Sequence, residues 1–217
     1  MKKYLFILIL ALSSITSMAQ GIRFSVFVDP KLAWMNSDLK SVHKESSKLG
    51  VNIGLNVDKF FAKNYAIMSG ISIDNTGGKL LFNEKYRIKL NGPDTTLNSG
   101  SVVNYKLQYI SVPLGLKFKT NEIGYFTFFS HLGLNAGVNI KATAEVENFE
   151  LRNENISDEI NLFDLRYFIG AGIEYSIGGN SAIICAITYT NGFVDITNNS
   201  NNKVTLRNFA LRIGVLF

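Results

Sequence analysis

The chain has 217 residues, which fits a single domain, and it carries 22 Lys and Arg against 17 Asp and Glu. The basic residues are scattered, without basic runs or interleaved aromatic residues, which excludes the usual pattern of a nucleic-acid-binding protein. The single cysteine, Cys185, excludes a disulfide within one chain and is expected to be a small strand residue. No stretch reaches the roughly 18 consecutive apolar residues of a membrane-spanning helix.

The first residues have the layout of a secretory signal peptide. Two lysines precede an apolar run that ends at Leu12, and small residues follow up to Ala19. The apolar run is too short to span a bilayer, which takes about 20 residues. We predict a cleaved signal peptide over residues 1–19 and a single mature domain over residues 20–217. Removing the two lysines leaves 20 basic residues against 17 acidic ones.

Apolar and polar residues alternate along the rest of the chain, which is typical of strands whose two faces meet different environments. Residues 50–60, GVNIGLNVDKF, place Val, Ile, Leu and Val at odd positions and Asn, Gly, Asn and Asp at even positions between them. The pattern predicts eight strands, at residues 22–35, 49–61, 64–80, 103–119, 124–143, 161–178, 181–195 and 203–217.

The connections between these strands alternate in length. FAKN, TNEIG and IGGN mark three tight turns, whereas the other four connections are longer and polar. In an up-and-down arrangement the three turns and both chain ends lie on one side, and the four loops lie on the other. This is the layout of an outer-membrane barrel, with short periplasmic turns and longer outer loops. Most predicted strands also reach the roughly 9–11 residues that a tilted strand needs to cross a bilayer.

The apolar face carries the bulky residues, while the other face is rich in Gly, Asn and Ser. A membrane barrel turns its apolar face outward to lipid, whereas a soluble, lipocalin-like barrel, the alternative, turns it inward. We therefore predict an all-β fold, an eight-stranded antiparallel up-and-down transmembrane β-barrel in a bacterial outer membrane. Aromatic residues near strand ends are expected to form interfacial girdles: Trp34, Phe60, Phe61, Tyr65, Tyr125, Phe126, Tyr167, Tyr175 and Phe217.

The polar face predicts a lumen lined by charges of both signs. Eight strands enclose a space just wide enough to be filled by side chains, and buried charges have to be paired or solvated. We expect a polar plug with trapped water; an ion or proton path is the alternative. The residues expected to point inward are Arg23, Asp29, Asp58, Asp74, Lys117, His131, Lys141, Arg166, Glu174 and Arg212.

No set of residues predicts a catalytic site. Ser130 and His131 are adjacent in a strand and therefore point to opposite faces, so they cannot act as nucleophile and base. The glycines of residues 168–175, FIGAGIEY, lack the third glycine and the helix of a dinucleotide site. The acidic third loop, residues 145–159, lacks the spacing of a calcium loop and is expected to be solvated. We expect no enzymatic activity, no catalytic, cofactor-binding or metal-binding residues, and no cofactor.

Two segments carry a family resemblance. The last strand, NFALRIGVLF, ends on Phe217 and resembles the C-terminal β-signal read by the outer-membrane assembly machinery. Residues 107–119, LQYISVPLGLKFK, are similar to the Tyr-x-x-(Val/Ile)-Pro-(Leu) strand of porin-family and PorT-like outer-membrane barrels of Bacteroidota. The resemblance covers essentially the whole mature chain, and these barrels are related in architecture to the small OmpX- and OmpA-type barrels. Pro113 cannot donate to a strand ladder, so we expect an irregularity there.

The fold predicts an integral outer-membrane protein that is not an enzyme and presents four outer loops as a structural or interaction scaffold. The resemblance implies two alternatives, an accessory component of a secretion or assembly complex and a passage for small solutes or ions. The expected partners are outer-membrane lipids and lipopolysaccharide, the assembly machinery through the C-terminal strand, and a protein or glycan at the outer loops. No nucleic-acid partner is expected, and the chain is expected to be a monomer.

Overall fold

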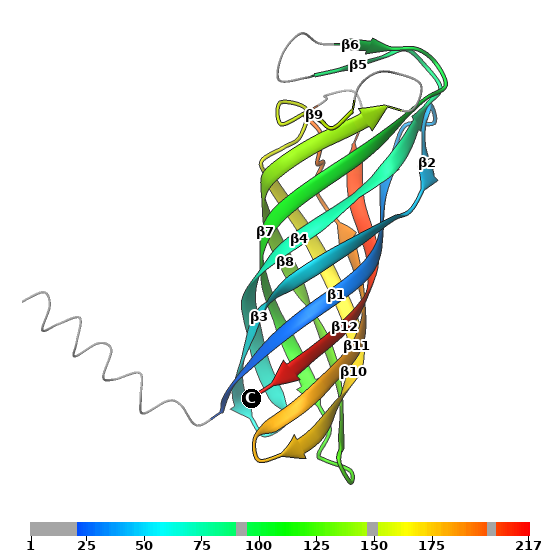
Figure 1. Cartoon of the computed structure of the whole chain (residues 1–217). Helices are drawn as coiled ribbons and strands as arrows, with labels where there is room; N and C mark the ends of the chain where they lie inside the picture. Colours follow the sequence, from blue (N-terminus) through cyan, green and yellow to red (C-terminus); the bar gives the residue numbers. More distant parts are fainter. Residues whose placement is uncertain (1–20, 90–94, 147–151, 199–202) are drawn as a thin grey trace, which may run out of the picture.

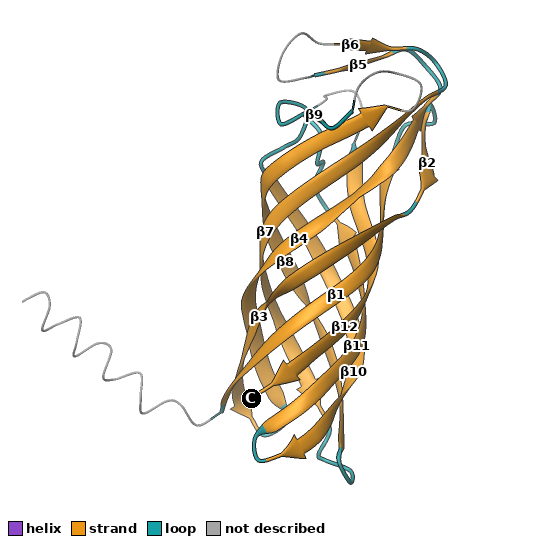
Figure 2. Cartoon of the chain, viewed as in Figure 1, coloured by secondary structure: helices purple, strands orange, loops and turns teal. Residues whose placement is uncertain are grey.

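The computed structural model describes residues 21–89, 95–146, 152–198 and 203–217, so the predicted signal peptide lies outside the described residues. No helix in the described ranges is long and apolar enough to cross a membrane. Eight long strands make up the wall of the molecule (Figures 1 and 2). They are β1 (Ile22–Ser37), β3 (Lys48–Ala62), β4 (Tyr65–Phe82), β7 (Ser101–Lys119), β8 (Phe126–Val146), β10 (Phe163–Gly178), β11 (Ser181–Gly192) and β12 (Val204–Leu216).

Each of the eight long strands pairs antiparallel with the next one along the chain, and β12 pairs with β1 to close the barrel. The closing ladder runs from Ser25 opposite Leu216 to Ser37 opposite Val204. Each predicted strand range overlaps one of the observed strands. The predicted fold class, an eight-stranded antiparallel up-and-down transmembrane β-barrel, is confirmed.

The two ends of the barrel differ, as the loop lengths predict. One end, called the turn end, carries the tight turns and both ends of the barrel domain, where Phe24 and Phe217 exchange two backbone hydrogen bonds of 3.0 and 2.9 Å. The opposite end, called the loop end, carries the long connections (Figure 1). These connections contain β2 (Val42–Ser46), which pairs with β4, β5 (Tyr86–Ile88) and β6 (Thr95–Leu97), which form a hairpin, and β9 (Glu154–Asn155), which pairs with β8.

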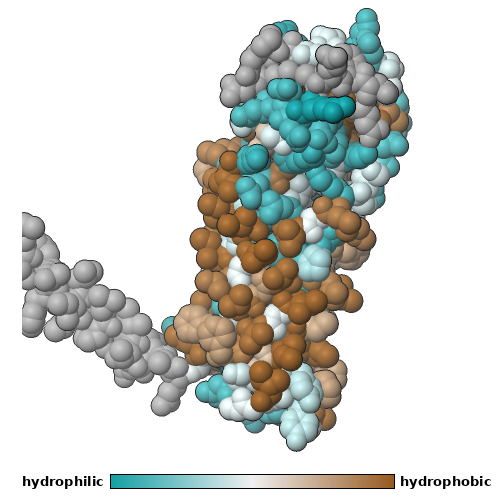
Figure 3. All heavy atoms as spheres, in the orientation of Figure 1, coloured by the Kyte–Doolittle hydropathy of each residue, from teal (hydrophilic) through white to brown (hydrophobic). Residues whose placement is uncertain are grey.

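On the face that Figure 3 shows, the wall of the barrel is apolar over most of its height, between a more hydrophilic turn end and the hydrophilic loop end. On β12, Phe209, Ile213 and Val215 point outward and are about half exposed, whereas Asn208 and Leu216 point inward and are buried. The outward direction of the bulky residues in the final strand is therefore confirmed.

Toward the loop end the pattern inverts, and the barrel interior becomes apolar. On β12, Val204 and Leu206 are buried inside while Arg207 turns outward. Above the membrane the outer face meets water, so apolar side chains are stable only inside. A polar lumen along the whole barrel was therefore the wrong expectation for this end. The buried cluster, called the apolar cap, consists of Met35, Val42, Leu80, Phe82, Ile88, Leu97, Val103, Tyr105, Leu107, Tyr109, Ala142, Ala144, Val146, Ile156, Ile160, Ile196, Val204 and Leu206.

A β-bulge in β8 reverses the direction of one predicted lumen residue. The register between β7 and β8 shifts at Ile140, and both Ile140 and Lys141 are exposed. Beyond the bulge, Ala142 and Ala144 point inward. One extra residue moves every following side chain to the opposite face, so the prediction that Lys141 lines the lumen is wrong.

Pro113 lies at an irregularity, as its missing N–H predicts. The ladder between β4 and β7 is interrupted between the pair Ser69–Leu114 and the pair Ser72–Ser111, although the register does not shift. The hydroxyl of Ser69 donates to the carbonyl oxygen of Pro113 at 3.0 Å. A side chain therefore satisfies a backbone acceptor where the ladder is broken.

Outward-facing aromatic rings form an arc toward the loop end on the wall made by β1, β12, β11 and β10. Trp34 and Phe209 have ring centroids 5.8 Å apart, and Tyr189 lies 4.9 Å from Phe209. Tyr167 continues the contacts, 6.4 Å from Tyr189 and 5.1 Å from Phe193. These five residues are called the aromatic arc.

A second group of aromatic residues surrounds the turn end, as predicted. The exception is Phe60, which is half-buried and lies 4.6 Å from Lys119 Nζ and 5.9 Å from the guanidinium carbon of Arg23. Phe60 therefore faces the cations of the barrel mouth rather than an interface, because strand alternation puts it on the same inward face of β3 as Asn56 and Asp58. The contacting aromatic residues of this group are Phe61, Tyr65, Phe118, Tyr125, Phe126 and Tyr175.

Candidate functional site

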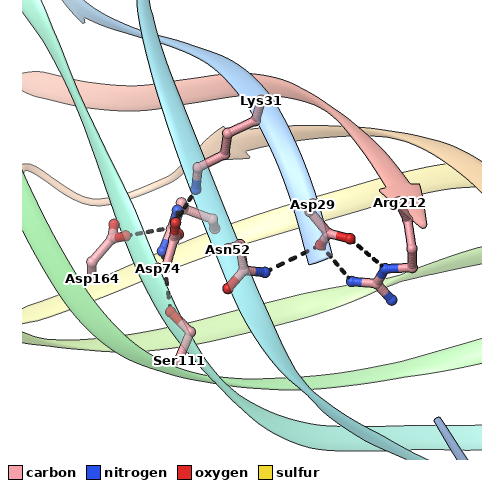
Figure 4. A network of polar contacts seen from close by, with 8 residues as sticks. Asp29, Lys31, Asn52, Asp74, Ser111, Asp164 and Arg212 are labelled. Carbon is pink, nitrogen blue, oxygen red and sulfur yellow. Dashed lines mark hydrogen bonds and ion pairs between the residues drawn. The ribbon is translucent and has the colours of Figure 1, made fainter. Parts of the chain in front are cut away.

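The lumen below the apolar cap contains three groups of ion-paired side chains, two of which are drawn in Figure 4. At its centre, Asp74 accepts hydrogen bonds from Lys31 Nζ and from Arg166 Nη1, the latter at 2.9 Å. Arg166 Nε also lies 2.6 Å from Asp164 Oδ2. All four side chains are buried, and they come from β1, β4 and β10. This group therefore links three strands across the lumen.

A second ion pair joins β1 to β12. Arg212 donates to both oxygens of Asp29, from Nε at 2.9 Å and from Nη2 at 2.8 Å. Asn52 adds a hydrogen bond to Asp29 Oδ2 at 3.2 Å, and the guanidinium carbon of Arg212 lies 3.8 Å from the centroid of the Phe27 ring. A bidentate pair of this kind holds both side chains in one orientation.

A third group lies toward the turn end. Lys117 Nζ is 2.7 Å from Asp58 Oδ2 and 2.6 Å from Glu174 Oε1, and all three side chains are buried. Arg23 lies at the partly exposed mouth of the barrel, and its Nη1 is 3.9 Å from Glu174 Oε2. The same ammonium group of Lys117 lies 4.6 Å from the centroid of the Phe129 ring.

The charges of these groups balance, which satisfies the rule that buried charges are paired. Seven of the ten predicted lumen residues are buried there, Arg212 is partly buried, Arg23 lies at the mouth and Lys141 is outside. Lys31 and Asp164 were missed, although each lies two residues from a predicted lumen residue and so shares its face. The paired cations are Arg23, Lys31, Lys117, Arg166 and Arg212, and the paired anions are Asp29, Asp58, Asp74, Asp164 and Glu174.

His131 lies in a packed part of the lumen. Its Nε2 is 3.0 Å from Thr188 Oγ1, and its ring contacts those of Phe129 and Phe168. Ser130 is exposed on the outer face, so the prediction that these neighbours point apart is confirmed. A cavity of about 60 Å³ beside His131 is large enough for a few water molecules.

Two glycines make room for a lumen aromatic residue. Gly115 on β7 and Gly133 on β8 are directly opposite one another, and a Cβ on either would lie 2.8 Å from Phe168 Cζ. A side chain at either position would displace the ring. The lumen is therefore packed at this level by Phe168 as well as by paired charges.

The hairpin of β5 and β6 covers the loop end. Ile88 and Leu97 contribute fully buried side chains to the apolar cap. Glu159, which is almost fully buried, accepts hydrogen bonds from the Tyr86 hydroxyl and from the backbone N–H of Lys89, the latter at 3.1 Å. The prediction that the acidic third loop is solvated is therefore wrong for Glu159, which attaches that loop to the hairpin.

Among the residues that the structure describes, no three His, Cys, Asp or Glu side chains are grouped so that they could hold a metal ion. Glu147 and Glu150 of the third loop lie outside the described ranges. Cys185 is an exposed free thiol on β11, and His43 is exposed on β2. The structure therefore places these two residues on the outer surface, away from the lumen groups.

Comparison with solved structures finds outer-membrane barrels. Neisserial surface protein A matches with a TM-score of 0.50 and 13% identity, over 89% of this chain and 95% of that chain. The attachment invasion locus protein Ail of Yersinia pestis matches with a TM-score of 0.43 and 15% identity, over 91% of this chain and 99% of that chain. The outer membrane protease OmpT of Escherichia coli matches with a TM-score of 0.47 and 9% identity, over 90% of this chain and 96% of that chain. At 13% identity the likeness to Neisserial surface protein A shows the fold alone.

No curated protein matches the chain. The family described as "Outer membrane protein beta-barrel domain" matches residues 17–198, which is most of the chain. The apolar outer face, which is suited to contact with lipid, and the closed barrel agree with this match. This chain therefore belongs to the outer membrane protein β-barrel family, whose place is the bacterial outer membrane.

Proposed function

We propose that this protein is a closed, non-enzymatic membrane scaffold that presents its loop end to a protein or glycan outside the cell. One observation carries the proposal: the apolar cap, the three ion-paired groups and Phe168 occupy the described lumen, and they leave a cavity of about 60 Å³ beside His131 and one of about 170 Å³ at the turn-end mouth. A barrel filled in this way offers its outer loops, rather than its interior, for interaction.

The filled lumen argues against the passage of small solutes. An ion crossing the barrel would have to separate the pair of Arg166 and Asp74 and then cross the apolar cap without its hydration shell. Both steps are costly in a medium of low dielectric constant. The porin-like alternative is therefore the less favoured one.

The proposal that the protein is not an enzyme rests on side-chain geometry. Ser130 and His131 point to opposite faces, and the hydroxyl that does contact His131, that of Thr188, is inside the packed lumen. A general base has to be within reach of a substrate. The cavity beside His131 has a volume of about 60 Å³. No substrate larger than a few water molecules fits there.

The test is single-channel recording of the refolded, full-length mature protein in planar bilayers. We expect no steady conductance above that of protein-free bilayers, with an open porin in the same lipid as the positive control. Insertion is verified by protease protection of the barrel in matching liposomes. Steady conductance from inserted protein would overturn the closed scaffold.

A second candidate is an accessory role in a secretion or assembly complex, which the PorT-like resemblance of residues 107–119 favours. This segment forms most of β7, where Leu107 and Tyr109 belong to the apolar cap. Crosslinking in intact membranes should then recover a stoichiometric complex around this chain. Recovery as a monomer under the same crosslinking would contradict this role.

We also propose that residues 1–19 are removed on export, as their layout indicates. Mass spectrometry of protein extracted from outer membranes should then give a mature chain that begins at Gln20. A mass that includes the first residues would contradict the proposed cleavage.

A further inference from the structure

A groove of about 350 Å³ lies on the outer wall at the loop end, over β3, β4, β7 and β8. It is called the basic groove because three lysines, Lys48, Lys106 and Lys141, line it together with Leu49 and Gln108. It lies outside the lumen, since Lys106 and Lys141 belong to the outward faces of their strands.

Two backbone irregularities build this groove. The β8 bulge turns Lys141 outward, as described above. The break between β2 and β3 places Lys48 so that its Nζ reaches the carbonyl oxygen of Tyr105 at 3.3 Å and Asn104 Oδ1 at 3.4 Å on β7. The strand between them, β4, contributes Gly77, where a Cβ would lie 2.1 Å from the Tyr105 carbonyl oxygen. The close approach of β4 and β7 thus depends on a residue without a side chain.

The groove carries a net positive charge. The ammonium groups of Lys79 and Lys106 lie near enough to Lys48 to repel it. The acidic group in contact with the groove is Glu145, which forms an ion pair with Lys106 and accepts a hydrogen bond from Asn104 at 3.2 Å. Among the described residues that line the groove or pair with its lysines, three lysines stand against one carboxylate, an excess of two positive charges.

The lysines begin where the apolar outer face ends. On β7, Val112 and Ile110 are exposed apolar residues, and Lys106 is the second outward residue beyond them. On β8, Lys141 directly follows the exposed Ile140, and on β3, Lys48 precedes Leu49, which is 79% exposed. Figure 3 shows the same change from an apolar to a hydrophilic surface. The basic groove therefore lies at the level of the outer lipid headgroups.

The opposite wall, made by β1, β12, β11 and β10, carries aromatic rather than basic residues toward the loop end. There the aromatic arc, Trp34, Phe209, Tyr189, Tyr167 and Phe193, occupies the outward positions, as is usual for an interfacial girdle. Outward positions of β7 and β8 near the loop end carry Lys106 and Lys141 instead. A cationic surface next to exposed apolar residues complements an anionic headgroup attached to acyl chains.

We propose that the basic groove binds the phosphorylated headgroup of an outer-leaflet glycolipid of the lipid A type. Lys48, Lys106 and Lys141 contact its phosphates, while its acyl chains lie against Leu49 and Ile140. Lysine is a point charge that suits phosphate, and each lysine near an anionic surface adds favourable free energy. The inference depends on the outer-membrane location and is independent of the closed-scaffold proposal.

The test is native mass spectrometry of the folded mature protein in detergent, titrated with bis-phosphorylated lipid A. The variant Lys48→Gln/Lys106→Gln/Lys141→Gln should bind on the order of a hundredfold more weakly. The matched control, Lys40→Gln/Lys85→Gln/Lys203→Gln, removes the same charge from exposed loop-end positions and should bind like wild type. Glu145→Gln should bind several-fold more tightly, which a merely structural role of the lysines would not produce.

Two further arms identify the ligand. Lipid A without phosphates should bind as weakly to wild type as phosphorylated lipid A binds to the triple variant. Inorganic phosphate at millimolar concentration should not displace lipid A, because it lacks acyl chains. Three outcomes would each overturn the proposal. They are an equal loss of lipid A affinity in both triple variants, tight binding of dephosphorylated lipid A, and displacement of lipid A by inorganic phosphate. If the triple variant fails to fold, the single variant Lys141→Gln, at an exposed residue, is titrated instead and should also bind lipid A more weakly than wild type.

Discussion

Arg166 on β10 and Asp74 on β4 meet across the lumen, with Arg166 Nη1 2.9 Å from Asp74 Oδ2. Two strands, β7 and β8, separate them along the wall, so the pair spans the barrel interior rather than one ladder. Lys31 on β1 binds the same carboxylate from the other side. Asp74 therefore joins three parts of the wall through a single side chain.

Replacing this carboxylate should destabilise the barrel strongly. Asp74→Asn leaves Lys31 and Arg166 buried with one fewer negative charge, and breaking a buried pair costs about 3–5 kcal/mol. We expect a lower denaturant midpoint for unfolding in detergent micelles. The exposed Asp158→Asn serves as control and should unfold like wild type. Equal midpoints for both variants would show that the lumen pairs contribute little.

The final strand should decide whether the barrel assembles. Phe209, Ile213 and Val215 point outward, and Phe217 exchanges two backbone hydrogen bonds with Phe24 at the closing seam. Changing the three outward residues to Asp places three carboxylates on the lipid-facing surface, which is unfavourable to a degree that depends on their depth in the bilayer. We expect both this triple variant and deletion of Phe217 to be lost from the outer-membrane fraction.

The control for this assembly experiment is Leu39→Asp, at an exposed loop-end residue. It should reach the outer membrane and show the same heat-dependent gel mobility as wild type. Normal surface exposure of the triple variant would count against the assignment of β12 as a lipid-facing closing strand.

The hairpin of β5 and β6 should depend on Glu159. Glu159→Ala removes the acceptor for the Tyr86 hydroxyl and the Lys89 backbone N–H, and loss of a buried partner costs about 1–3 kcal/mol. We expect faster cleavage of the loop end by a protease added outside liposomes, with the barrel wall resistant. Asp158→Ala, the exposed neighbour, should be cleaved at the wild-type rate. An unchanged rate for Glu159→Ala would mean that apolar burial alone holds the hairpin.

Cys185 provides a direct probe of the lipid-facing surface. It is the single cysteine of the chain and is exposed on β11, between the outward-facing Ile183 and Ile187. A charged maleimide should label it slowly in liposomes and rapidly after unfolding, because hydrocarbon excludes the reagent. A Cys185→Ser/Lys85→Cys variant moves the thiol to an exposed loop position and should react at once. Rapid labelling of Cys185 in intact liposomes would place it in water.

Much of the lumen follows from strand alternation, and its exceptions have a local cause. Asp29, Asp74 and Arg166 point inward because they share a face with small and polar neighbours. Lys141 does not, because the bulge at Ile140 inserts one residue, and period-two counting cannot detect such an insertion. Glu159 looks like part of a solvated acidic loop until the hairpin from another loop folds over it.

The alternation of Phe209, Ile213 and Val215 by itself determined a lipid-facing final strand, because a strand between two solvents must sort its residues by face. Loop lengths likewise determined which end carries the turns. The partners inside the barrel were decided only by the tertiary structure, since Arg166 meets Asp74 through closure and stagger of all eight strands. The apolar cap was decided in the same way, because where the membrane ends depends on how far each strand rises, which no single strand encodes.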